Sequence, residues 1–122
     1  MADPQTFPID EKETGRYTAT VVGSDGVTPL PGATLTTLTL TLYAIKQDGT
    51  DQVIRNHVNA LNANNVTVDA AGLLVWLVQV TDTTMVEAIP FERHIALFEW
   101  TWPTGAGKHE VVLLVRNLRQ VT

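Results

Sequence analysis

The chain has 122 residues, of which 44% are hydrophobic and 17% are charged, a composition typical of one globular domain rather than a disordered segment. Its net charge is −5 at pH 7 and its eight Lys and Arg residues form no cluster, which argues against nucleic-acid binding. It contains no cysteine, which excludes disulfides and thiol chemistry, and no apolar run approaches the ~18 residues that a membrane span requires.

Residues 1–13 are polar and acidic and carry two large apolar side chains, Phe7 and Ile9. We expect an N-terminal arm over residues 1–13, followed by one domain over residues 14–122. The arm has two interpretations: a disordered tail, or a segment that orders on a neighbouring molecule through Phe7 and Ile9. It lacks the charged and apolar regions of a signal peptide, which together with the absence of cysteine indicates synthesis in a reducing cytoplasm.

Alternation of apolar and polar residues predicts the first strands. Residues 15–23 alternate, and the following Ser24-Asp25-Gly26 is a turn signal because Asp bonds its own backbone and Gly accepts positive φ. A long strand follows over about residues 34–46, with leucines on one side and mostly threonines on the other, as expected for one buried and one solvated face. Asp48-Gly49 predicts a hairpin into a short strand at about residues 51–56.

The second half of the chain is richer in apolar strands. Residues 57–65 are the one segment where we expect a helical turn, and their four asparagines make a long helix unlikely. Further strands are predicted at about residues 66–68, 73–80, 92–102 and 109–116. The pattern of about seven strands without a long helix favours an all-β fold, an antiparallel immunoglobulin-like β-sandwich, with a barrel as the competing architecture.

Few residues are placed for chemistry. Glu92 and His94 share a strand face, and we interpret them as a buried hydrogen-bonded pair rather than a metal or acid–base site, because no third ligand has a motif spacing. Residues 105–108 (GAGK) lack the first glycine and the final Ser or Thr of a phosphate-binding loop, so we expect a hairpin loop there. The chain has no nucleophile elbow and no paired carboxylates on one strand face. We therefore expect no enzyme activity, no metal and no cofactor.

The three tryptophans are Trp76, Trp100 and Trp102. Tryptophans on central strands usually fill the core of a sandwich, and we interpret Trp76 and Trp100 in this way. Trp102 lies next to Pro103 at the end of a predicted strand, and its alternative role is to stack against carbohydrate.

Several strands are apolar on both faces, which predicts an interface. If Trp76, Phe98 and Trp100 point into the core, large aliphatic side chains on the same strands point outward: Leu73, Val75, Leu77, Ile95 and Leu97. Their possible covers are residues 57–65, the N-terminal arm or another subunit. We predict a subunit or partner interface formed by these residues together with Phe7 and Ile9. For residues 111–115 the pattern does not decide which side chains face inward.

The order of motifs resembles that of the small immunoglobulin-like structural proteins of tailed-phage virions. The likeness covers about residues 30–119 and rests on a pattern of strands rather than on a catalytic signature. The segments that carry it are residues 38–43 (LTLTLY), 62–68 (NANNVTV), 72–76 (GLLVW), 92–102 (ERHIALFEWTW) and 110–118 (EVVLLVRNL).

This resemblance implies a non-enzymatic structural protein of the virion that is made in the host cytoplasm. The first expectation is a capsid decoration (cement) protein, a dimer or trimer that binds the major capsid protein on the assembled shell and staples neighbouring subunits. The first alternative is a neck, tail or baseplate adaptor, used in a ring of few copies. The second alternative, from another class, is a carbohydrate-binding module. We expect neither nucleic acid nor a membrane as a partner.

Overall fold

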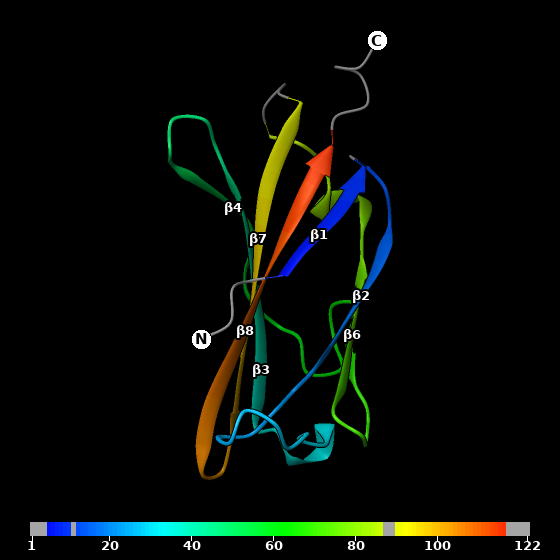
Figure 1. Ribbon diagram of the computed structural model, residues 1–122, viewed down its shortest axis with the longest axis vertical. Helices are drawn as coiled ribbons and strands as arrows, with labels where there is room; N and C mark the ends of the chain where they lie inside the picture. Colours follow the sequence, from blue (N-terminus) through cyan, green and yellow to red (C-terminus); the bar gives the residue numbers. More distant parts are fainter. Residues whose placement is uncertain (1–4, 11, 87–89, 117–122) are drawn as a thin grey trace.

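The computed structural model describes residues 5–10, 12–86 and 90–116, which form two β-sheets (Figure 1). The five-stranded sheet has the order β1-β8-β7-β3-β4, and the three-stranded sheet has the order β2-β6-β5. The strands are β1 (Gln5–Asp10), β2 (Gly15–Thr20), β3 (Thr37–Ile45), β4 (Asp51–Asn59), β5 (Val66–Val68), β6 (Leu73–Val78), β7 (Phe91–Trp102) and β8 (Gly105–Arg116). Two 3-10 turns, η1 (Gly32–Thr34) and η2 (Val80–Asp82), are also described.

The predicted all-β chain with two sheets is confirmed. The described residues contain eight strands rather than about seven, and no α-helix. The additional strand is β1, which falls in the predicted arm and pairs in parallel with β8, whereas the other strand pairings are antiparallel. Phe7 lies opposite Leu113 and Ile9 opposite Val115, so this segment extends the sheet of its own chain.

Alternate residues of both sheets fill the space between them. The inward side chains of β7 and β8 include Phe98 and Leu113, both fully buried, and those of β6 include the fully buried Trp76. The rings of Trp76 and Phe98 meet edge to face with centroids 5.6 Å apart, which joins the two sheets. The side chains of residues 111–115 that face inward are Val111, Leu113 and Val115.

The predicted helical turn in residues 57–65 is wrong. Residues up to Asn59 belong to β4, and the segment after it forms a loop. Four residues between 57 and 65 have a left-handed backbone, with φ between 48° and 71°: His57, Asn62, Asn64 and Asn65. Asparagine tolerates this conformation better than most residues, and a right-handed helix cannot contain it. The asparagines therefore favour an irregular loop instead of a helical turn.

The predicted hairpin between β7 and β8 is present, but its turn is confined to Pro103 and Thr104, and residues 105–108 begin β8 instead of forming the loop. The two glycines lie under tryptophan rings of the neighbouring strand. A Cβ added at Gly105 would lie 2.6 Å from Cζ2 of Trp102, and one added at Gly107 would lie 2.6 Å from Nε1 of Trp100. The glycines therefore serve packing against indole rings rather than a turn or a phosphate.

The two edges of the five-stranded sheet differ from its interior. At one edge, β1 contains Pro8, which has no N–H to donate. At the other edge, the register between β3 and β4 shifts at Leu40/Leu42 and again at Leu42/Tyr43. Both features interrupt the regular row of backbone groups that an edge strand presents.

Candidate interaction surfaces

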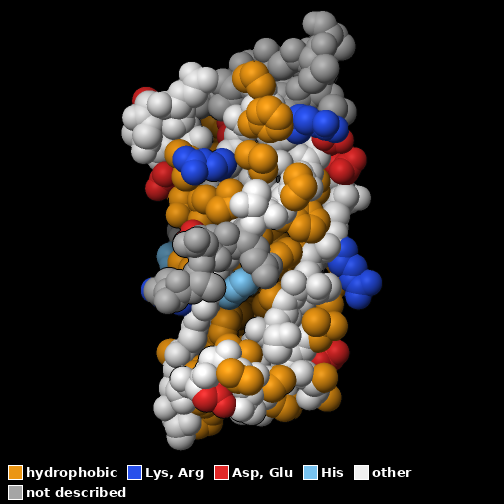
Figure 2. Space-filling view, viewed as in Figure 1, with side chains coloured by type: hydrophobic (Ala, Val, Ile, Leu, Met, Phe, Trp, Pro, Cys, Tyr) orange, Lys and Arg blue, Asp and Glu red, His pale blue; other side chains and the backbone are white. Residues whose placement is uncertain are grey.

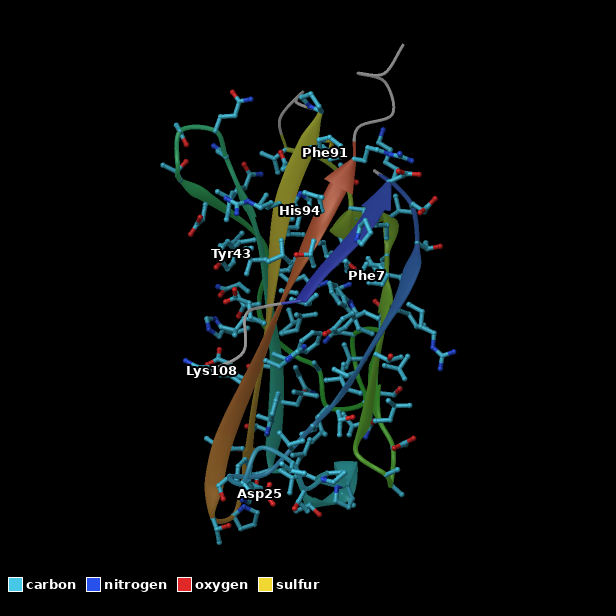
Figure 3. The ribbon with its side chains drawn as sticks, viewed as in Figure 1. Phe7, Asp25, Tyr43, Phe91, His94 and Lys108 are labelled. Atoms are coloured by element: carbon cyan, nitrogen blue, oxygen red, sulfur yellow. The ribbon has the colours of Figure 1, made fainter. Side chains whose placement is uncertain are left out.

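The seven residues predicted at an interface occupy three different places. Phe7 and Ile9 face into the sandwich of their own chain: Ile9 is 6% exposed, and Phe7 packs against the core with its ring 5.9 Å from that of Tyr17. Figure 3 shows Phe7 beside β1 on the side facing β2. Because the alternation of β1 turns these two side chains inward, the structure does not place them on an outer surface.

Leu73, Val75 and Leu77 lie on the outer face of the three-stranded sheet. Leu77 is 48% exposed and Leu73 is 36% exposed, while Val75 between them is partly covered. Their cross-strand neighbours on β2 are Thr20, Thr18 and Arg16 respectively. This row, which we call the leucine stripe (Leu73, Val75 and Leu77), is an apolar line bordered by hydroxyls and one cation.

Ile95 and Leu97 lie on the outer face of the five-stranded sheet. They belong to a group of outward-facing side chains that we call the outer patch: Tyr43, Ile45, Ile95, Leu97, Val112 and Leu114. Ile95, between Tyr43 and Val112 in the register, is only 5% exposed, and Leu97 is partly exposed. In Figure 2, hydrophobic side chains gather in the upper half of the face shown, over β7, β8 and β1, with charged side chains at its margins.

Two more exposed apolar residues extend the outer patch. Val53 of β4 lies opposite Tyr43 and is 56% exposed, and Phe91 at the start of β7 is 54% exposed. Exposed apolar side chains gathered on one sheet face are characteristic of an interaction site. The leucine stripe and the outer patch lie on opposite sides of the sandwich, so one flat partner cannot cover both.

A buried ion pair that the sequence pattern did not reveal joins the two sides of the sandwich. Asp82 of η2 is fully buried and accepts two hydrogen bonds from Arg55 of β4, with Nε–Oδ1 and Nη2–Oδ2 distances of 2.7 Å. The backbone N–H of Gln79 also donates to Asp82 Oδ2 at 2.8 Å. This forked geometry satisfies both charges and fixes the connection between β6 and β7 against the edge strand.

Glu92 and His94 form the hydrogen-bonded pair that their spacing predicted. Nε2 of His94 lies 2.5 Å from Oε1 of Glu92, and Nδ1 lies 2.7 Å from the carbonyl oxygen of Asp82. Because a carbonyl oxygen only accepts, Nδ1 carries a proton and donates it. Both side chains are almost completely buried, at 2% exposure or less. The hydrogen bond from His94 to the carbonyl oxygen of Asp82 holds the end of β7 against η2.

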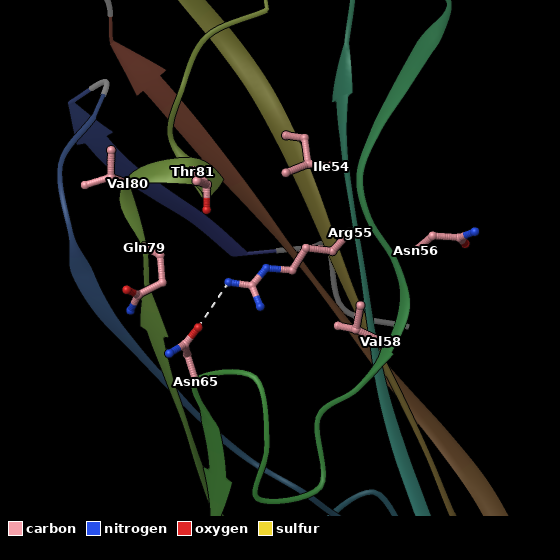
Figure 4. A pocket seen from close by; sticks show the side chains of 8 residues that line it. All are labelled: Ile54, Arg55, Asn56, Val58, Asn65, Gln79, Val80 and Thr81. Atoms are coloured by element: carbon pink, nitrogen blue, oxygen red, sulfur yellow. Dashed lines mark hydrogen bonds between the residues drawn. The ribbon is translucent and has the colours of Figure 1, made fainter.

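A groove of about 670 Å³ runs along the open side of the sandwich between β4 and the segment around η2 (Figure 4). Figure 4 shows Arg55 reaching across it toward Asn65. The guanidinium group is already bound by Asp82, and its Nη1 donates to the carbonyl oxygen of Asn64 at 3.0 Å. The remaining lining is amides, Thr81 and aliphatic side chains, so the groove offers a ligand neither an unpaired charge nor an aromatic platform.

The tryptophans offer no open platform either. Trp76 is fully buried, and Trp100 is 3% exposed and donates its indole N–H to the carbonyl oxygen of Val22 at 3.2 Å. Trp102 is partly buried, packs against the core and lies over Gly105. A carbohydrate would need an exposed ring face on which to stack, and Trp102 presents at most a part of one.

Among the described residues, no group of three or more His, Asp or Glu side chains is arranged to hold a metal ion. Over the same part of the chain, no helix has the length and apolar character to cross a membrane.

Tyr17 of β2, which is 4% exposed, and the partly buried His109 of β8 form a pair between the two sheets. Oη of Tyr17 lies 2.5 Å from Nε2 of His109, and the two rings stack with centroids 5.9 Å apart. Burial lowers the pKa of His109 below its ordinary value of 6.5. The neutral imidazole is therefore favoured in the folded chain, and its Nε2 is hydrogen-bonded to the Tyr17 hydroxyl.

We expect this pair to make stability depend on pH. Since the pKa of His109 is lower in the folded chain, the unfolded chain binds the proton more readily, so stability is complete above pH 6.5 and falls as the pH drops below it. Urea unfolding at about pH 8 and about pH 5.5 checks this, a range that avoids most carboxylate titration. His109→Gln is expected to reduce the difference between the two pH values; an unchanged difference would assign it to other groups.

Comparison with known proteins gives no family for this chain. No protein-family model matches it, and no curated protein matches it. We therefore infer its function from the arrangement of its strands and exposed side chains.

Proposed function

We propose that this chain is a non-enzymatic structural protein of a virion with an immunoglobulin-like fold, and specifically a capsid decoration protein. The strand order supports the fold: β2, β6 and β5 correspond to strands B, E and D, and β3, β4, β7 and β8 correspond to strands C, C′, F and G. The chain departs from antibody domains because it has no cysteine and because its core Trp76 lies on β6 rather than on the strand equivalent to C.

The observation that carries the proposal is the leucine stripe. Leu73 and Leu77 remain 36% and 48% exposed on a regular strand. On β2, Leu73 lies beside the short hydroxyl side chain of Thr20 and Leu77 lies beside Arg16. Both leucines remain accessible to a second surface. A narrow apolar row with a polar border suits repeated weak binding, and many copies on one shell stabilise it together through avidity. The sequence resemblance to tailed-phage structural proteins supplies the class of partner, the major capsid protein.

The identity of the particle component is tested by counting. The ratio of this chain to the major shell protein is measured by mass spectrometry in purified particles of the virus that encodes it. Decoration predicts a copy number comparable to that of the shell protein. A ring of few copies would assign the chain to the neck, tail or baseplate instead, and absence from the particle would overturn the virion assignment.

The leucine stripe is tested by substitution. Leu77→Lys is expected to weaken binding to undecorated shells at least about tenfold, because a buried aliphatic contact is replaced by a charge. Co-sedimentation of the purified chain with shells measures this. Val27→Lys is the matched control, since Val27 is 76% exposed in the loop after β2 and lies outside the stripe. Equal losses for both variants would remove the stripe from the interface.

A further inference from the structure

We propose that the outer patch of the five-stranded sheet pairs with the same patch of a second copy of this chain. The proposal deepens the proposed function, because it assigns self-pairing to one face and leaves the leucine stripe on the opposite face for the shell. It begins from the outward side chains of β7. Ile95 lies at the centre of the patch, with Arg93 two residues before it and Leu97 two residues after it.

The charges at the two ends of the patch are opposite. Arg93 is exposed and lies beside Leu114, whereas Glu110 lies beside Leu97 at the other end. Neither Arg93 nor Glu110 has an ion-pair partner in the part of the chain that the structure describes. Arg93 and Glu110 lie on opposite sides of Ile95 along the strands, because Leu97, the residue opposite Glu110, is four positions after Arg93 on β7. That separation is about 14 Å along the strands.

A two-fold axis through the row of Ile95 and across the strands makes these ends complementary. The rotation places β7 of one copy over β7 of the other with the strand direction reversed. Arg93 of one copy then lies over Leu97 of the other, one strand from Glu110. Strands are ~4.8 Å apart, which is within the reach of an arginine side chain. The symmetry forms this pair twice. It also places the apolar row of Tyr43, Ile95 and Val112 in one molecule against the same row of the second molecule.

The size of the face suits a weak dimer. The four spacings of ~4.8 Å between five strands, multiplied by the length of β7 from Phe91 to Glu99 of about 27 Å, give about 500 Å² of flat face per copy, or about 1,000 Å² for the pair. This buried area lies at the lower end of the range for specific interfaces, so we expect a dissociation constant on the order of 10–100 μM. Burial already acts on this face: it raises the pKa of Tyr43, and the negative charges of Glu110 and Asp51 add to the effect.

Sedimentation equilibrium of the purified full chain, in the absence of shells, tests the pairing. A monomer–dimer equilibrium is expected for the parent chain. Arg93→Glu and Glu110→Arg are each expected to weaken it at least about tenfold, and the double charge exchange is expected to restore it to within about threefold. Leu77→Lys, on the opposite face, is the control and should leave the equilibrium unchanged.

The outcomes separate this proposal from the proposed function. A parent chain that stays monomeric up to roughly 500 μM overturns the pairing, whose expected dissociation is tighter than that. The pairing is also overturned if the single charge variants dimerise as strongly as the parent chain, or if the double charge exchange does not restore dimerisation. If Arg93→Glu weakens binding to shells while sedimentation is unaffected, the outer patch belongs to the shell interface and the pairing is again overturned. Loss of shell binding by Leu77→Lys concerns only the proposed function, because it is measured on particles.

Discussion

Asp82→Ala is expected to lower the free energy of unfolding by about 3–5 kcal/mol. The substitution removes both acceptors of the Arg55 fork and the acceptor of the Gln79 N–H. Arg55 is left with its charge in a site where its side chain is only 13% exposed. An unpaired charge of this kind costs more than the intact pair contributes, because the desolvation of the remaining partner is no longer offset. Urea unfolding followed by tryptophan fluorescence measures the loss.

The matched control is the ion pair at the surface. Arg116 and Asp10 also form a 2.7 Å salt bridge, but the side chain of Arg116 is 51% exposed. Water and salt screen such a pair, so Arg116→Gln is expected to leave the unfolding midpoint nearly unchanged. A second test uses Arg55→Met with Asp82→Leu, which removes both charges and is expected to cost less than Asp82→Ala alone. If the double variant costs as much as the single one, packing rather than charge explains the loss.

Trp76→Ala is expected to destabilise the chain by about 3–5 kcal/mol, whereas Trp76→Phe is expected to cost about 1 kcal/mol or less. The alanine variant leaves a cavity beside Phe98, where the Trp76 ring packs edge to face. The phenylalanine variant keeps an aromatic ring there. It also removes the indole N–H, which is buried and has no hydrogen-bond partner among the described residues. An unpaired buried donor costs about 1–3 kcal/mol, so its removal offsets part of the lost volume.

Trp100→Phe is the control for this interpretation. Trp100 is 3% exposed, and its indole N–H donates to the carbonyl oxygen of Val22. The same substitution there removes a satisfied hydrogen bond and leaves the carbonyl unpaired, so it is expected to cost more than Trp76→Phe. Denaturant unfolding of both variants gives the comparison. Equal costs would mean that ring volume alone decides, and the unpaired donor of Trp76 would have no measurable effect.

The apolar strands of the second half were predictable because alternation determines which side chains share a face. The spacing of Glu92 and His94 placed both on one side of β7, and the structure has them hydrogen-bonded. Likewise, Trp76 and Trp100 were expected in the core and are buried there. In each case the information is local, since a period of two in the sequence is also the geometric period of a strand.

The remaining features depend on contacts between distant segments. Arg55 and Asp82 are 27 residues apart, and neither lies in a motif that would indicate a partner. The asparagines of residues 57–65 were interpreted through helix propensity, although their left-handed backbone serves a loop. The inward direction of Phe7 follows only from the pairing of β1 with β8, at the opposite end of the chain. Alternation alone does not choose a strand's partner.

The edges of the five-stranded sheet have a consequence for the way copies associate. Pro8 in β1 and the register shifts beside β4 both hinder the addition of another strand to the sheet. Growth by edge addition is open-ended and leads to fibres, whereas contacts through sheet faces can close after a fixed number of copies. Because both edges hinder strand addition, we expect copies of this chain to associate through their sheet faces rather than edge to edge.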